Sequence, residues 1–257
     1  MAAKYRLLAL DMDGTLLNDE QLITPKTVEW IKKAVDAGVH VCLSTGRASR
    51  SAMPYAEQLG LKTPMIMVNG SEVWRAPYEL YRRSLMDPLL VQRMYDIAQE
   101  LGIWFWAYSV DEVYNKHNWD GDIQGREWLK FGYSTEDDEI RHKLLMLLQD
   151  LGGLEITNSS PTNLEINPLG VNKASGIREV CKLLGLDMSE VVAVGDSLND
   201  LAAIQQAGLG VAMGNAQETV KQEADAVVSS NNEDGIAEVI EKYILNDAEA
   251  PAAHSTN

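Results

Sequence analysis

Two aspartates, Asp11 and Asp13, stand directly after an apolar run and just before a glycine. The run, residues 5–10, is typical of a buried strand, so both carboxylates are expected at its carboxyl end. A buried carboxylate is costly unless it is paired or binds a metal, and two at one strand end therefore indicate a cation site or a proton-transfer role. An Asx-type turn, in which both aspartates only cap a loop, is the alternative for this pair taken alone.

Three further predicted strands also end in small or acidic polar residues beside a glycine. Ser44 and Thr45 follow one of them, Asn69 follows the next and Asp196 follows the last. Ligands of open parallel sheets bind at the carboxyl ends of the strands, where the connecting loops meet. We therefore expect all four strand ends to contribute to one site.

The residue types at these ends suit magnesium and a phosphate group. Asp11, Asp13 and Asp196 offer the hard oxygen ligands that Mg²⁺ prefers, and so few protein ligands leave room for a substrate phosphate. Lys173 begins a predicted helix, so its ammonium group and the helix amino terminus can both face an anion. A solvated lysine at a helix end is the alternative for Lys173 taken alone.

Together these groups describe phosphoryl transfer through a covalent carboxylate intermediate. Thr45 and the amide of Gly46 can donate hydrogen bonds to the phosphate oxygens. Asp11 can attack phosphorus because Lys173 and a metal neutralise the approaching charges. Asp13 can protonate the leaving oxygen and later deprotonate water, which divides acid–base work between two carboxylates.

The order of predicted elements places this site in an α/β fold. Strands and helices alternate over the first 80 residues and again after residue 172, which predicts a doubly wound, Rossmann-like parallel sheet. Thr24 and Pro25 open the first helix as a capping residue and a proline at the first helical position. We expect strands at 5–10, 39–44, 65–68, 191–196, 210–213 and 226–228, and helices from 25 to the stop at Gly38, at 49–59, at 173–184, from 197 to Gly208 and at 235–244.

Residues 85–168 interrupt this alternation and predict an inserted α+β cap domain. A helix from Asp87 to about Gly102, an aromatic strand at 103–109, helical stretches at 126–130 and 136–151, and two antiparallel strands at 153–157 and 163–167 are expected. The catalytic core then comprises 1–84 and 169–246, and 247–257 form a flexible tail. We expect the cap to act as a mobile lid with hinges at 82–87 and 168–171.

Composition restricts the partners of the protein. The formal charge of −16 argues against nucleic acid and anionic membranes, which bind basic surfaces. No apolar stretch reaches the length of a spanning helix, and the chain enters a core strand without a signal peptide, so a cytoplasmic location is expected. The only cysteines, Cys42 and Cys181, lie in apolar runs and are predicted to be buried thiols.

Four segments resemble the motifs of the haloacid dehalogenase superfamily of phosphotransferases, in the order in which that family carries them. They are DMDGTLL at 11–17, STGR at 44–47, NK at 172–173 and GDSLND at 195–200. The large insertion between the second and third motifs is similar to that of the Cof-type, subfamily IIB sugar-phosphate phosphatases. The resemblance covers nearly the whole chain.

The resemblance implies a role for each aspartate of these motifs. Asp11 would be the nucleophile and a ligand of Mg²⁺. Asp13 would be the general acid and base and would bind the metal through its backbone carbonyl. Asp196 would also bind Mg²⁺, and Asp200 would support Lys173 or the metal from behind.

The resemblance also implies how the phosphoryl group is held. Thr45 and Lys173 would bind it together with the backbone amides of Met12 and Gly46, and Asn199 would contact the phosphate. Arg47 and Asn69, in the loops after two strands, are candidates for contacting the rest of the substrate.

Three activities are compatible with these motifs. A Mg²⁺-dependent phosphatase acting on small phosphorylated metabolites is the leading interpretation, a phosphosugar mutase is second, and a non-catalytic phosphate-binding regulator is third. Asp13 argues against dehalogenation, because dehalogenases of this resemblance lack the second aspartate. Hexose phosphates, pyridoxal phosphate, flavin mononucleotide and pyrimidine-pathway phosphates all remain open as substrates.

Aromatic residues of the insertion are candidates for substrate selection. On the expected strand, Trp104, Trp106 and Tyr108 share one face, whereas Phe105 and Ala107 share the other. The first face either closes over the active site and contacts the leaving group, or packs beneath the helices of the insertion.

Overall fold

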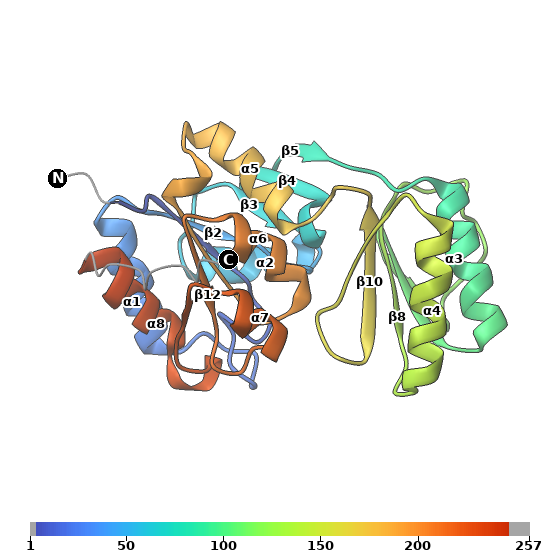
Figure 1. Ribbon diagram of the computed structural model, residues 1–257. Helices are drawn as coiled ribbons and strands as arrows, with labels where there is room; N and C mark the ends of the chain where they lie inside the picture. The colour runs from blue at the N-terminus through green and yellow to red at the C-terminus, as the bar shows by residue number, and fades with distance from the viewer. Residues whose placement is uncertain (1–3, 247–257) are drawn as a thin grey trace.

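The computed structural model describes residues 4–246. Two units stand side by side, with the first and last thirds of the chain in one and the middle third in the other (Figure 1). The predicted tail at 247–257 lies outside the described residues. Within 4–246, no helix has both the length and the apolar character needed to cross a membrane.

The larger unit is built on a parallel sheet with the strand order β13-β12-β11-β1-β2. The strands are β1 (Leu7–Leu10), β2 (His40–Leu43), β11 (Val191–Gly195), β12 (Leu209–Ala212) and β13 (Ala226–Val227). Strand β1 is central, with β2 on one side and β11 on the other. The loops that follow β1 and β11 therefore leave the carboxyl end of the sheet toward opposite sides. Such a divergence opens a crevice for ligands, and the predicted Rossmann-like core is confirmed.

A further strand lies beside β2 at the edge of the sheet. The strand β3 (Met65–Met67) lies beside β2 through a parallel bridge between Ser44 and Ile66. It continues into an antiparallel hairpin of β4 (Glu72–Ala76) and β5 (Glu79–Arg83), which the sequence analysis did not anticipate.

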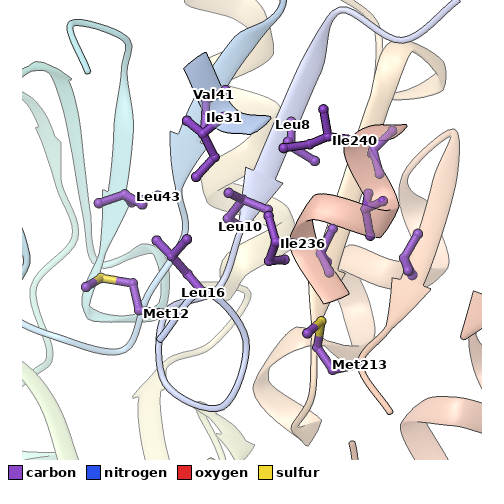
Figure 2. Close-up of a cluster of buried hydrophobic side chains, with 14 of the residues drawn as sticks. Leu8, Leu10, Met12, Leu16, Ile31, Val41, Leu43, Met213, Ile236 and Ile240 are labelled. Atoms are coloured by element: carbon purple, nitrogen blue, oxygen red, sulfur yellow. The ribbon is translucent and has the colours of Figure 1, made fainter. Parts of the chain in front are cut away.

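Helices cover the faces of the core sheet (Figure 1). Their bounds are α1 (Pro25–Asp36), α2 (Ser49–Gln58), α5 (Lys173–Leu184), α6 (Leu198–Gln206), α7 (Glu218–Glu223) and α8 (Gly235–Val239), which continues as a π-helix to Leu245. Leu8 and Leu10 of β1 point toward Ile240 and Ile236 of the last helical segment (Figure 2). Thr24 caps α1 by accepting a hydrogen bond from the Thr27 amide, as predicted.

Residues 88–168 form a second unit, called the cap below, in which an antiparallel sheet is covered on one face by two helices. Its strand order is β7-β6-β8-β10-β9. The strands are β6 (Trp104–Ser109), β7 (Val113–Asn115), β8 (Trp128–Ser134), β9 (Leu154–Thr157) and β10 (Asn163–Pro168), and the helices are α3 (Pro88–Leu101) and α4 (Asp138–Leu151). Both helices lie on the side of this sheet that faces away from the core (Figure 1).

The helical stretch expected at 126–130 is wrong, because residues 128–134 form the central strand β8. This strand pairs with β6 on one side and β10 on the other. A short run of aromatic and apolar residues has no decisive period of its own, so long-range pairing chose the strand.

Candidate active site

A buried lysine joins two of the predicted aspartates. Lys173 is the first residue of α5, and its side chain is completely buried. Its Nζ donates to Asp11 Oδ1 at 2.5 Å and to Asp200 Oδ1 at 2.7 Å. The helix start is held by Asn172, whose side chain accepts from the Ser175 amide in a capping box. Lys173 is therefore a fixed positive charge beside the predicted nucleophile.

Asp200 also organises the loop that carries Asp196. The second carboxylate oxygen of Asp200 accepts from the amides of Asp196 and Ser197, at 3.1 and 3.2 Å. Asp196 itself accepts from Thr15 Oγ1 at 3.1 Å and from Ser197 Oγ at 2.9 Å. Hydrogen bonds thus fix the orientation of the Asp196 and Asp200 carboxylates.

The carboxylates of Asp11, Asp196 and Asp200 form one acidic cluster. One oxygen of each lies within 4.8 Å of the others. Burial, followed by the charge of Asp200, raises the pKa of Asp11 well above its usual range, and the same two causes raise the pKa of Asp196 to about 6. Carboxylates that resist ionisation without a counter-charge are suited to binding a divalent cation.

The turn after Asp13 depends on a glycine. Gly14 has a φ of +74°, and a Cβ built there would lie 2.7 Å from Asp196 Oδ2. Only a residue without a side chain allows this approach. The turn thereby brings the first and fourth motifs into contact, although Thr15 and Asp196 are 181 residues apart in the chain.

Asp13 is not one of the three carboxylates of the acidic cluster, and it is held by Arg47. Arg47 Nε lies 2.7 Å from Asp13 Oδ2, and Nη2 lies 2.5 Å from Oδ1. The Arg47 Nη2 group also donates to the side-chain oxygen of Gln21. Half of the Asp13 side chain is exposed, so this carboxylate can exchange protons with bound substrate or water.

The loop after β2 presents donors toward the same end of the sheet. Thr45 is fully buried, and its hydroxyl oxygen accepts from the Arg47 amide at 3.1 Å, which leaves the hydroxyl proton free to donate. Asn69, the polar residue after β3, has a positive φ of 55° and is also buried. Asn199 Nδ2 lies 3.5 Å from Asn69 Oδ1, while Asn199 Oδ1 is buried and has no hydrogen-bond partner within residues 4–246.

A small cavity of about 160 Å³ lies between the core motifs and the cap sheet. It brings together residues from all the expected strand ends except β3. The lining residues are Asp11, Asp13, Gly46, Arg47, Tyr108, Lys130, Ser159, Glu165, Ser197 and Asn199.

Four of these lining residues were missed by the sequence analysis: Lys130, Ser159, Glu165 and Ser197. Lys130 and Glu165 form a buried ion pair on the cap sheet, with Nζ 3.1 Å from Oε1. The available signal was a single lysine within an otherwise apolar and aromatic stretch, which is unusual for a residue that normally stays exposed. That stretch was assigned to a helix, which hid the face on which Lys130 lies.

The aromatic candidates on β6 separate from one another. Tyr108 lines the cavity and packs against the core. Trp104 contacts His117 and is 37% exposed, and Trp106 lies over Gly132; neither lines the cavity. Phe105, on the opposite face of β6, packs beneath the cap helices. The alternative that Trp104 and Trp106 pack beneath those helices is therefore wrong.

The turn between β9 and β10 docks the cap onto the fourth motif. Asn158 O accepts from the Asn199 amide at 3.0 Å, and Asn158 Oδ1 accepts from Gln217 Nε2 at 3.0 Å. Ser197 Oγ, whose proton is shared with Asp196, also lies 3.2 Å from Ser159 O. The cap is therefore in direct contact with the loop that carries Asp196 and Asn199.

Comparisons with known proteins identify the family of the chain. The family model described as haloacid dehalogenase-like hydrolase matches residues 8–143 and 115–240. The chain is 47% identical over 240 residues to 5-amino-6-(5-phospho-D-ribitylamino)uracil phosphatase YcsE of Bacillus subtilis, with 93% of this chain and 96% of the relative covered. It is 32% identical to the B. subtilis phosphatase YitU of the same substrate name, with 95% and 99% covered.

A solved structure supports the same relationship. The haloacid dehalogenase-like hydrolase from B. subtilis superposes with a TM-score of 0.82 at 26% identity, covering 92% of this chain and 99% of that one. The agreement extends over both the core and the cap.

Proposed function

Because the chain belongs to the family of haloacid dehalogenase-like hydrolases, we propose that it is a Mg²⁺-dependent phosphatase that acts through an aspartyl-phosphate intermediate. The observation that carries this proposal is the hydrogen-bonded triad of Asp11, Lys173 and Asp200 at the carboxyl end of β1. A carboxylate beside a buried cation is an activated nucleophile for an anionic phosphate.

In the first step, an oxygen of Asp11 attacks phosphorus and the bond from phosphorus to the leaving oxygen breaks. Asp13 gives its proton to that oxygen, so the product leaves as an alcohol. In the second step, Asp13 takes a proton from water as the water oxygen attacks phosphorus. The bond between Asp11 and phosphorus then breaks, which releases inorganic phosphate and regenerates the Asp11 carboxylate and the protonated Asp13.

The transferring phosphoryl group is held by donors from two loops and two helices. Lys173 supplies a charge that is already fixed by two carboxylates; burial alone would lower its pKa, but Asp11 and Asp200 outweigh burial and raise it. Thr45 offers its hydroxyl proton, and the amides of Met12 and Gly46 offer two more donors. Asn199 completes the set from α6. Preorganised donors of this kind stabilise charge without reorganising during the reaction.

The acidic cluster fits a divalent cation. In the described site, five carboxylates (Asp11, Asp13, Glu165, Asp196, Asp200) face three cations (Arg47, Lys130, Lys173), which leaves a deficit of positive charge where a phosphate must bind. Asp11, Asp196 and the backbone carbonyl of Asp13 would hold Mg²⁺. Bound there, Mg²⁺ supplies positive charge to the phosphate oxygens. Asp200 supports Lys173, because both of its oxygens are occupied by Lys173 and backbone amides.

For the substrate, we propose 5-amino-6-(5-phospho-D-ribitylamino)uracil, the compound in the name of the relative that is 47% identical. The cavity beyond the aspartates supports a phosphorylated, hydroxylated chain, because its walls include Ser159 and Ser197 as well as the ring of Tyr108. A small polar cavity favours a flexible chain next to the phosphate over a bulky ring at that position.

The test is phosphate release from a panel of phosphomonoesters that includes this compound, hexose phosphates, pyridoxal phosphate and flavin mononucleotide. We expect the ribitylamino compound to give the highest kcat/KM, and we expect EDTA to stop release and Mg²⁺ to restore it. A product that is an isomeric phosphate ester, formed without free phosphate, would identify a mutase instead. Equal turnover in EDTA would reject the role of Mg²⁺.

A further inference from the structure

The buried ion pair of Lys130 and Glu165 belongs to the cap, yet both partners also contact the core. Lys130 is 2% exposed and Glu165 is 5% exposed. Lys130 Nζ donates to the carbonyl oxygen of Gly46 at 2.9 Å. Glu165 Oε2 accepts from Asn69 Nδ2 at 2.6 Å. Each charge thus reaches one of the two core loops that follow β2 and β3.

The contact with Gly46 is close on several sides. A Cβ built on Gly46 would lie 2.9 Å from Asn69 Oδ1, 3.3 Å from Glu165 Oε2 and 3.4 Å from Lys130 Nζ. The cap pair therefore packs directly on the backbone whose amide is proposed to bind the phosphoryl group. A shift of Lys130 or Glu165 removes the support on that side of the loop.

All the bonding capacity of the Lys130 ammonium group is already used. Its three hydrogens are matched by Gly46 O, by Glu165 Oε1 and by the face of the Tyr108 ring, whose centroid lies 4.6 Å from Nζ. Glu165 is similarly engaged, because Oε1 also accepts from Ser159 Oγ at 3.2 Å. Contacts within the protein thus satisfy the charges of both Lys130 and Glu165, so neither residue requires a hydroxyl group of the substrate as a partner.

The carbonyl held by Lys130 belongs to the peptide between Gly46 and Arg47. The amide of the same peptide donates to Thr45 Oγ1, and the Arg47 side chain holds Asp13. The orientation of this one peptide plane therefore affects the Thr45 hydroxyl, the Gly46 backbone and the carboxylate of Asp13. A cap residue that fixes the plane acts on the phosphate-binding groups and on the acid–base residue together.

We propose that Lys130 is a positioning residue that makes the catalytic geometry of the 44–47 loop dependent on a docked cap. This inference rests on the proposed phosphatase function of the same site. Docking brings Lys130 to the Gly46 carbonyl and Glu165 to Asn69. Reaction is then confined to the docked state, in which the cap covers the cavity.

The experiment compares three variants of the full chain. Lys130→Met removes the ammonium group but keeps an unbranched side chain, and it leaves the buried charge of Glu165 without a cation. Lys130→Met/Glu165→Gln removes both charges and so avoids that cost. Glu165→Gln alone keeps an oxygen for Lys130. The matched control is Lys143→Met, which changes a lysine on α4 whose side chain is 59% exposed.

We expect Lys130→Met to lower kcat by about 10- to 100-fold, as misplacement of reacting groups does. The loss is expected to be equal for p-nitrophenyl phosphate and for the larger substrate, and the double variant should share it. Lys143→Met should keep kcat within a few-fold of the original protein, and Glu165→Gln, which keeps an oxygen for Lys130, should lose less than Lys130→Met. A normal kcat in Lys130→Met, or its recovery in the double variant, would overturn the proposal.

Two other results also count against it. A rise in KM for the larger substrate alone would identify Lys130 as a leaving-group contact, and not as a positioning residue. Hydrogen exchange of residues 44–48 provides a readout that needs no turnover: we expect faster exchange in Lys130→Met than in Lys143→Met, and equal rates would reject the coupling. If the unmodified protein releases no phosphate from any ester, the proposed function fails while this measurement still tests the coupling.

Discussion

The guanidinium group of Arg47 holds the Asp13 carboxylate at both oxygens, through Nε at 2.7 Å and Nη2 at 2.5 Å. This two-point contact fixes the plane of the carboxylate as well as its position. Asp13 lines the cavity and, in the proposed reaction, moves the proton. Arg47 therefore orients the acid–base group, and it does so from the loop that Lys130 supports.

Replacing this arginine tests the two-point contact. Arg47→Lys keeps the charge but offers a single point of contact, so Asp13 should lose its fixed plane. We expect kcat to fall by about tenfold, with a smaller change in KM, because a misplaced acid weakens the transition state more than the bound substrate. Steady-state kinetics measure this effect, and Arg75→Lys, at an exposed arginine of β4, is the control. Equal losses in both variants would contradict the assignment.

Asp11→Asn should separate activity from stability. An amide cannot attack phosphorus, so phosphate release from p-nitrophenyl phosphate should be lost, while Mg²⁺ binding is partly retained. Burial and the charge of Asp200 raise the pKa of Asp11, so its ionised form destabilises the folded protein when no metal is bound. In EDTA, the Asp11→Asn variant should therefore unfold at a temperature equal to or above that of the original protein.

Thermal unfolding and a phosphate-release assay on the same preparation check both parts of this expectation. Asp36→Asn, at an exposed position that ends α1, should change neither quantity. Substantial turnover by Asp11→Asn would remove Asp11 from the role of nucleophile.

We expect the stability difference between the Glu165→Gln variant and the original protein to depend on pH. Burial raises the pKa of Glu165, but the charge of Lys130 and the hydrogen bond from Asn69 outweigh it, so the pKa lies below its ordinary value of 4.5. The unfolded chain then binds more protons near that pH, and the stability contributed by this carboxylate is present above about 4.5 and is lost as pH falls through the folded-state pKa.

The variant leaves Lys130 buried without a counter-charge, so at pH 7 we expect its free energy of unfolding to be lower by about 3 kcal/mol. The difference should narrow as the pH falls below 4.5. Denaturant unfolding at pH 7 and pH 4 measures it, with the exposed Glu241→Gln as control. A difference that is constant with pH would show that Glu165 is not held as a carboxylate.

Tyr108 and Trp104 should differ in their effect on substrate binding, although both lie on the same face of β6. Tyr108 lines the cavity, whereas Trp104 packs against His117 outside it. Tyr108→Ala should raise KM for the ribitylamino substrate several-fold, and Trp104→Ala should leave KM unchanged. The reverse result would place the leaving group farther along the cap sheet than the cavity extends.

Local sequence patterns predicted most elements of the core because each carries its own signals. Thr24 and Pro25 open α1 as expected, and Lys173 begins α5. Where local signals are weak the predictions failed: the β4–β5 hairpin was not anticipated, and residues 126–130 were assigned to a helix. The strand β8 exists because β6 and β10 pair with both of its edges, and no local pattern records that pairing.

The cap side of the site depends on the same pairing. The register of β8 and β10 sets Glu165 opposite Gly132, so Lys130 and Glu165 are diagonal neighbours on one face. They are 35 residues apart in sequence, and neither belongs to a recognisable motif. A register shifted by one residue would place the two charges on opposite faces of the sheet.

The sequence by itself determined that aspartates, a lysine and small donors stand at the ends of buried strands, since burial period and capping are local properties. It also determined which chemistry those residue types favour. Only the tertiary structure decided that Arg47 holds Asp13, that Asp200 is occupied by Lys173, and that a cap ion pair supports the loop at Gly46. Those contacts join segments that are distant in the chain, and side-chain geometry across such distances follows from packing and not from local preference.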